Sequence, residues 1–108
     1  MKLTVTGKQL DIGDAFRTHI DEKLRSILSK YFGDALDVHV TVAHEGDRYR
    51  ASVMAHVGHN IELFAESESH EAYPAFDEAA EHLGKRLRRQ KRKLRDHHPP
   101  GASGDGTA

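Results

Sequence analysis

LDVHVTVAH, residues Leu36–His44, decides the fold, because apolar and polar residues alternate along it with the period of a β-strand. The stretch Arg48–Val57 alternates in the same way after a compact turn, and Ile61–Ala65 follows a second turn. Loops this short join antiparallel neighbours. We therefore expect these three stretches to form an antiparallel meander.

One more strand and two amphipathic helices surround the meander. Residues 2–7, KLTVTG, predict a short first strand that ends at Gly7. Residues 14–32 predict a helix, and a longer helix runs from about Tyr73 to about Arg95, with Ser69 as its candidate N-cap. The apolar stripes of the two helices comprise Phe16, Ile20, Leu24, Ile27 and Tyr31 in the first, and Phe76, Ala80, Leu83, Leu87 and Leu94 in the second.

The predicted order β-α-β-β-β-α belongs to the α+β class. We expect a four-stranded sheet with both helices packed on one face, similar to a double-stranded-RNA-binding domain. Residues 1–96 would form this one domain, whereas 97–108, HHPPGASGDGTA, have the composition of a disordered tail or the start of a linker. The opposite sheet face is left to polar residues, namely Asp37, His39, Thr41, Arg50, Ser52 and Glu62.

Residues 85–95, KRLRRQKRKLR, form a basic block that concentrates the positive charge of the chain. They hold 8 Lys and Arg and no acid, whereas residues 1–84 hold 8 basic against 15 acidic residues. The formal net charge of −1 therefore hides a basic helix end on an acidic domain. On a helical wheel, Leu83, Leu87 and Leu94 cluster on one side, and the basic residues fan out over the rest.

Two interpretations of the basic block are open. In the simpler one it is a solvated helix end, because the helix dipole favours cations in the last turn. That interpretation leaves Lys85 and Arg86 unexplained, since they lie more than two turns from the end, and like charges three or four residues apart repel.

A polyanion site accounts for the whole block. Arg side chains offer planar forks to phosphate oxygens, and a helix charged on nearly all its exposed surface suits folded RNA better than a smooth duplex. First-helix residues would widen the patch if the helices lie side by side. The candidate phosphate-binding residues are Lys85, Arg86, Arg88, Arg89, Lys91, Arg92, Lys93 and Arg95, with Lys23, Arg25 and Lys30 of the first helix.

Other classes of function find no support in the sequence. No apolar run is long enough for a membrane span, no secretory signal opens the chain, and no Trp or exposed Phe is expected that could insert into a membrane. There is no Cys, the nine His lack metal-ligand spacing, and no nucleophile motif or phosphate loop occurs. We expect a cytoplasmic binding protein without a metal or cofactor, and not an enzyme.

Beyond these patterns, the chain resembles a known family over about residues 1–96. The resemblance rests on VTGKQLDI before the first helix, on EKL and KYF within it, on AYPAFDEA at the start of the second helix, and on the basic block. Together, in this order, these motifs resemble the ribosome hibernation promoting factors, also called ribosome-associated inhibitor or Y proteins. Two features depart from the family pattern, namely Pro74 and the net negative charge of residues 1–84.

The resemblance implies a function that the residues alone do not name. Family members bind the small ribosomal subunit in the channel for mRNA and tRNA, with both helices on rRNA of the decoding region, and block translation in stationary phase or stress. The eleven candidate residues would then contact rRNA, and neither DNA nor a membrane is an expected partner. Long members carry a linker and a C-terminal domain that pairs ribosomes, so ribosome dimerisation is expected if such a domain is missing from this chain.

Two alternatives to that function follow from the residues. The basic helix could dock an acidic protein partner, in which case the chain is a protein-interaction module. It could also bind structured RNA in general, without preference for the ribosome.

Overall fold

The computed structural model describes residues 2–31, 37–58 and 60–95. The predicted β-α-β-β-β-α order is confirmed, and every predicted element is present within a few residues of its expected bounds. The elements are β1 (Lys2–Lys8), α1 (Asp14–Tyr31), β2 (Asp37–Glu45), β3 (Arg48–Val57), β4 (Ile61–Ser69) and α2 (Ala72–Arg95). The predicted tail, 97–108, lies outside the described residues.

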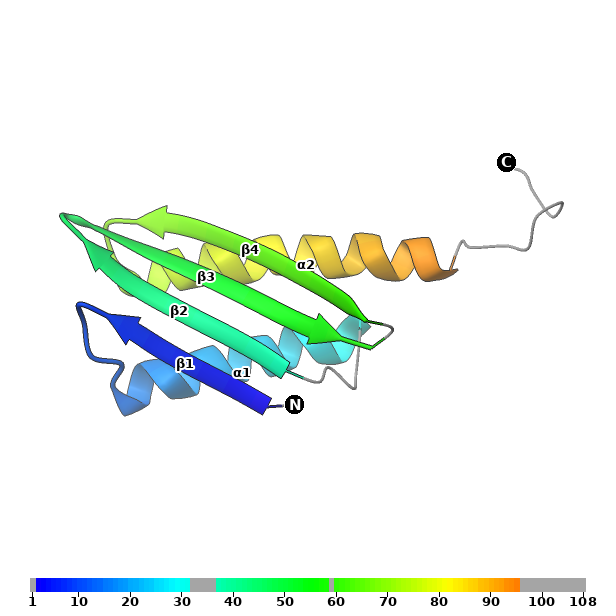
Figure 1. The fold of residues 1–108 in the computed structure, drawn as a ribbon, viewed down its shortest axis with the longest axis horizontal. Coiled ribbons are helices and arrows are strands. Elements are labelled where there is room, and N and C mark those ends of the chain that lie inside the picture. The colour runs from blue at the N-terminus through cyan, green and yellow to red at the C-terminus, as the bar shows by residue number, and fades with distance from the viewer. Residues whose placement is uncertain (1, 32–36, 59, 96–108) are drawn as a thin grey trace, which may run out of the picture.

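The four strands form one sheet in the order β1-β2-β3-β4. The pairs β2–β3 and β3–β4 are antiparallel, as the short turns predict, whereas β1 runs parallel to β2. A parallel pair needs a crossover connection, and α1 supplies it. Figure 1 shows the three-stranded meander with β1 added at its edge.

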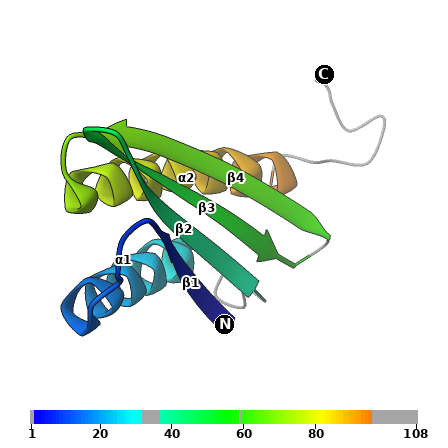
Figure 2. The ribbon, with the colours of Figure 1, turned by 60° about the vertical axis from the view of Figure 1, so that its left-hand side comes forward.

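Both helices lie on the same face of the sheet, as predicted (Figure 2). The described side chains of their apolar stripes meet the inward side chains of the strands, and the stripe of α1 includes Leu28, which the sequence-based stripe omitted. The side chains of Tyr31 and Leu94 lie outside the described part of the structure. The two helices also touch directly, since the rings of Phe16 and Tyr73 stack with centroids 4.4 Å apart. The largest fully buried side chains are Phe76, Ile20, Leu24, Leu83, Leu87, Val38, Val40, Val42, Val53 and Val57.

The turn between β2 and β3 contains Gly46, whose backbone conformation favours glycine. Gly46 has a φ of 63°, a left-handed conformation that glycine adopts without a steric penalty. Asn60, in the turn before β4, has a φ of 58° and is among the few other residues that tolerate this region. With these conformations the chain reverses direction between neighbouring antiparallel strands.

Three local predictions were wrong. Gly7 does not end β1, which continues to Lys8; a Cβ at Gly7 would lie 2.5 Å from the carbonyl oxygen of Leu10, so this glycine permits a close backbone approach. β4 does not end at Ala65 but continues to Ser69. Ser69 therefore belongs to a strand, and the first turn of α2 instead has the amide of Ala75 donating to the carbonyl of Glu71.

The expectation that no Phe is exposed was also wrong. Phe64 of β4 is 46% exposed and Met54 of β3 is 38% exposed, both on the face of the sheet that points away from the helices. The polar residues predicted for that face do lie there, together with this apolar pair on β3 and the edge strand β4. Among the described residues, no helix is long and apolar enough to cross a membrane.

Candidate nucleic-acid interface

The second half of α2 combines a buried edge with a charged surface. Leu83 and Leu87 are completely buried against the sheet and α1, so the helix remains docked beyond Gly84. Between and after these leucines, Lys85, Arg86, Arg88, Arg89 and Arg92 are exposed, and Lys91 is half-buried. Lys93 and Arg95 belong to the last turn of α2, but their side chains lie outside the described part of the structure.

A shallow groove of about 300 Å³ runs between α1 and α2. We call it the interhelical groove; its lining residues are Lys23, Ile27, Lys30, Glu81, Gly84, Lys85 and Arg88. Four of these seven are basic and one is acidic. The groove therefore brings Lys23 and Lys30 of α1 together with the start of the basic block, although more than fifty residues separate them in the sequence.

Lys91 extends this contact between the helices to the end of α1. Its Nζ donates to the carbonyl oxygen of Lys30 at 3.4 Å. Lys30 lies in the last turn of α1, where backbone carbonyls have no partner within the helix and the dipole favours a cation. Lys91 therefore has a structural partner as well as a place in the basic block.

An acid of α2 lies beside Lys23, outside the residues that line the groove. Asp77 Oδ1 lies 2.6 Å from Nε2 of His19 and 3.9 Å from Nζ of Lys23. These contacts join α1 to α2 and hold the side chain of Lys23 beside the groove. The positive charge consequently increases along α2 from Asp77 towards its C-terminus.

Arg25 does not join the groove. Its Nε donates to both carboxylate oxygens of Asp21, at 2.9 and 3.0 Å, one turn earlier on α1. Arg25 and Asp21 border a different depression beside Leu3, on the side of α1 towards β1. The sequence-based prediction had grouped Arg25 with Lys23 and Lys30 because it treated the first helix as a single surface.

The sequence-based reasoning also missed two parts of the groove. Ile27 and Gly84 form its apolar floor, and a Cβ at Gly84 would lie 3.5 Å from Cγ2 of Ile27. A glycine beside the basic block could have signalled a close approach of two helices. Its partner could not have been named, because the rotation of α1 relative to α2 depends on packing across the whole core.

The exposed cationic groups of this surface are suited to binding anions. Exposed guanidinium and ammonium groups form charge-assisted hydrogen bonds with phosphate oxygens, and Arg can do so with two bonds at once. Within the described residues, no group of three or more His, Asp or Glu side chains could hold a metal ion. The arrangement therefore fits an anionic polymer that presents phosphates from more than one direction.

The chain is similar to known proteins over most of its length. A family model described as sigma 54 modulation protein / S30EA ribosomal protein matches residues 3–95. The ribosome hibernation promotion factor of Rhizobium meliloti is 42% identical over 98 residues, which are 91% of this chain and 52% of that relative. The ribosome hibernation promoting factor of Azotobacter vinelandii is 31% identical, over 86% of this chain and 85% of that one.

A solved structure is also similar. The Protein Y N-terminal domain of Thermus thermophilus has a TM-score of 0.75 and 25% identity, covering 83% of this chain and 99% of that domain. The chain spans about half the length of the two rhizobial relatives, those of Rhizobium and Bradyrhizobium, but most of the Azotobacter one. Because the family model covers nearly all of the described residues, the chain belongs to the family of sigma 54 modulation proteins and S30EA ribosomal proteins.

Proposed function

We propose that this chain is a ribosome hibernation factor that binds the small ribosomal subunit in its mRNA and tRNA channel and inhibits translation in stationary phase or stress. The observation that carries the proposal is the juxtaposition of the basic block with Lys23 and Lys30 across the interhelical groove. The names of the relatives support the same role, since they are ribosome hibernation factors.

The proposed contact surface is the second half of α2 with the adjoining part of α1. Its residues would bind rRNA phosphates of the decoding region, and Arg25 would contribute least, because Asp21 already holds it. The proposed contacts are made by Lys85, Arg86, Arg88, Arg89, Lys91, Arg92, Lys93, Arg95, Lys23 and Lys30, with Arg25 as the weakest.

Inhibition would be steric and without turnover. A domain seated in the channel occupies the volume that mRNA and tRNA need, and the attraction of the basic surface for rRNA holds it there. Such a factor would act in the cytoplasm, where it meets ribosomes.

Co-sedimentation with isolated ribosomal subunits tests the proposal. The chain should sediment with the small subunit, and its affinity should fall by orders of magnitude between about 50 and 200 mM salt if six to eight phosphates are neutralised. Loading the subunit beforehand with mRNA and tRNA should prevent binding, because both compete for one channel. Binding that is unchanged on loaded subunits would locate the chain outside the channel.

The same assay distinguishes the two alternatives. A general binder of structured RNA would bind a plain RNA duplex as tightly as the small subunit at equal salt. A module that docks an acidic protein would remain unbound to subunits and would give a saturable protein complex instead. The proposed function requires preference for the small subunit over both.

A further inference from the structure

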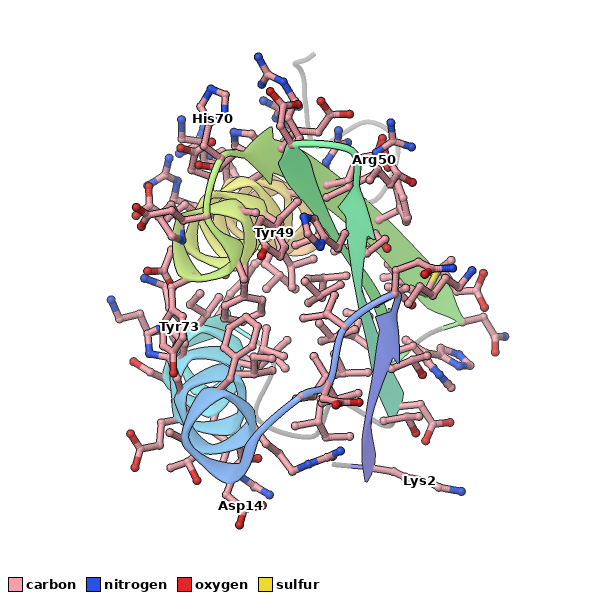
Figure 3. The ribbon with its side chains drawn as sticks, turned by 90° about the vertical axis from the view of Figure 1, so that its left-hand side faces the viewer. Lys2, Asp14, Tyr49, Arg50, His70 and Tyr73 are labelled. Carbon is pink, nitrogen blue, oxygen red and sulfur yellow. The ribbon has the colours of Figure 1, made fainter. Side chains whose placement is uncertain are left out.

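The second surface of interest is the outer sheet face, which comprises the side chains of β1–β4 that point away from the helices. Figure 3 shows Lys2 and Arg50 on this side and Tyr49 on the opposite side, towards the helices. No described helix covers the face (Figure 2). It therefore has room for a partner as broad as the sheet.

The charges on this face are arranged by strand. β1 presents Lys2 and Lys8, whereas β4, at the opposite edge, presents Glu62, Glu66 and Glu68. The two central strands repeat this contrast with the acid first: β2 presents Asp37 and Glu45, and β3 presents Arg48 and Arg50. On this face β1 and β3 therefore carry positive charge, and β4 and β2 carry negative charge.

The strand register places these charges at common levels. Lys2, Asp37, His56 and Glu62 form one row across the sheet, because each is paired with the next. Lys8 and Glu68 lie at the two ends of another row. Glu45 and Arg48 are paired in a third row, beyond Lys8 and Glu68.

A second copy can be placed face to face with the first, related to it by a two-fold axis that runs parallel to the strands, above the boundary between β2 and β3. This arrangement brings opposite charges together. It places β1 of a second copy over β4 of the first, and β2 over β3, each at its own level. Lys2 then faces Glu62 of the other copy, and Glu45 faces Arg48. Lys8 faces Glu68 in the same way. Isologous contacts of this kind occur twice, once on each side of the axis.

The outer sheet face also carries an exposed apolar patch, on β3 and the edge strand β4 about midway along the strands. Met54 and Phe64 are neighbours in one row, and both are substantially exposed. The same axis places Met54 over His39 and Phe64 over Thr4 of the second copy, and small Thr41 and Ser52 in the adjacent row allow two sheets to approach to about 10 Å. An exposed apolar patch between charged rows is a common feature of an interface.

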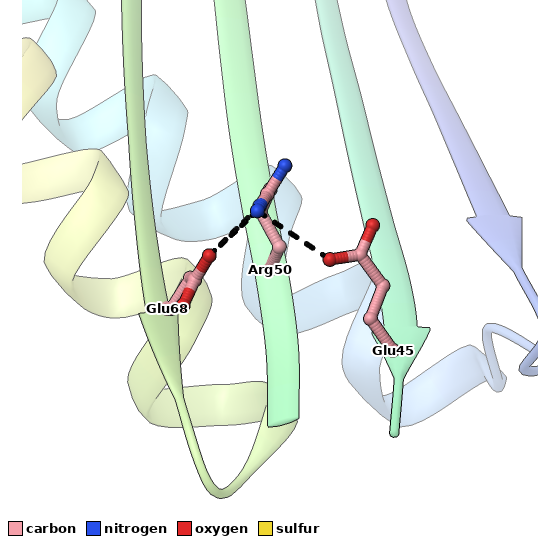
Figure 4. A network of polar contacts seen from close by, with 3 residues as sticks. All are labelled: Glu45, Arg50 and Glu68. Carbon is pink, nitrogen blue, oxygen red and sulfur yellow. Dashed lines mark hydrogen bonds and ion pairs between the residues drawn. The ribbon is translucent and has the colours of Figure 1, made fainter. Parts of the chain in front are cut away.

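Arg50 on this face already has ion-pair partners within the same chain. Arg50 lies between Glu68 and Glu45, with Nη2 at 2.7 and 3.5 Å from their carboxylate oxygens (Figure 4). The hydrogen bond from Arg50 to Glu68, followed by the charge of Glu45, raises the pKa of the guanidinium above its ordinary value. Arg50 therefore stays charged and holds Glu45 and Glu68 in place, where Arg48 and Lys8 of a second copy can approach them.

We propose that the outer sheet face is a two-fold interface between two copies of this chain. The resulting dimer has four layers, with the two sheets inside and the basic helices on opposite outer surfaces. Nucleic acid is a poor occupant for this face, since the glutamates of β4 repel phosphates.

The size of the face makes the dimer transient. Four strands of about seven residues cover roughly 19 by 23 Å, or about 440 Å² per copy. A standard interface buries about 800 Å² per partner. Exposed ion pairs fix orientation more than they add affinity, so we expect a dissociation constant between about 0.1 and 1 mM at low salt.

Sedimentation velocity of nuclease-treated protein, from about 1 µM to about 1 mM at low salt, tests the interface. The wild type should pass from monomer to dimer. Lys2→Glu with Lys8→Glu should remain monomeric, as should Glu62→Lys with Glu68→Lys, because each doublet places like charges opposite each other. An equimolar mixture of the two doublets should dimerise again, since the reversed charges then meet their opposites.

A matched control is Lys85→Glu with Arg89→Glu, which makes the same charge change on the helix layer and should dimerise like the wild type. Circular dichroism establishes that each variant is folded. A wild type that is monomeric at every concentration would overturn the proposal. So would doublets that still dimerise, or a mixture that stays monomeric.

Discussion

The two halves of α2 differ in what determines their composition. In the first half, Ala72–Gly84, Phe76 and Leu83 are buried and the outward acids make local contacts, such as Glu78 with Ser67. In the second half, Lys85–Arg95, only Leu87 is buried among the side chains described, and eight residues are basic. The fold accounts for the first half. It accounts for Leu87 in the second half but not for the basic residues.

This difference teaches that one continuous helix can carry two separable tasks. The apolar stripe docks the helix against the core. Because the stripe continues to Leu87, it also holds the basic surface beside α1. A substitution in the first half should therefore change stability, and one in the second half should change binding. The experiments below test that separation.

The largest expected effect is on stability and comes from Phe76→Ala. Phe76 is completely buried, and truncating such a side chain costs about 3–5 kcal/mol through lost burial and the remaining cavity. That is a large share of the about 5–15 kcal/mol by which domains are stable. Urea unfolding measures the change. Arg89→Ala is the control, and it should stay within about 0.5 kcal/mol of the wild type.

The next effect concerns two arginines that the sequence placed in the same group. Arg88→Ala should weaken binding to the small subunit about tenfold, or about 1.4 kcal/mol, because Arg88 lines the interhelical groove. It should also reduce the salt slope by about 1. Arg25→Ala should have a much smaller effect, since Asp21 holds that side chain. Equal losses for both variants would contradict the assignment of the groove.

The smallest effect lies at the boundary between the halves. Gly84→Ala should stabilise the protein by about 0.4–1 kcal/mol, because alanine restricts the unfolded chain and favours a helix. The added methyl would lie at an ordinary contact distance from Ile27. Thermal unfolding measures the gain. A loss of stability would mean that the helices are closer here than the structure shows.

Most of the fold could be predicted from periodicity. The strand pattern of residues 37–57 and the helical stripes are strong, because each buries one face. The end of β4 could not be predicted, since Glu66–Ser69 are polar on both faces and resemble a loop. In the structure, Glu68 pairs with Arg50 across the strands, a contact that depends on a register the local sequence does not contain.

The candidate site was only partly predictable for the same reason. The basic block is visible in the sequence because its residues are contiguous. The grouping of Lys23 and Lys30 with Arg88, and the separation of Arg25, depend on how α1 is rotated against α2. The exposed Phe64 was missed although strand alternation places it opposite Ile61, Leu63 and Ala65, because only polar residues were considered for that face.

The most direct test of the central claim compares two triple charge reversals. Arg88→Glu, Arg89→Glu and Arg92→Glu change the basic block, whereas Lys2→Glu, Lys8→Glu and Arg48→Glu make the same change in net charge on the outer sheet face. Binding to the small subunit is measured at low salt, with the chain dilute enough to be monomeric. We predict that the first variant, folded by circular dichroism, loses binding and that the second keeps it. Retained binding by the first variant, or equal loss by both, would contradict the account.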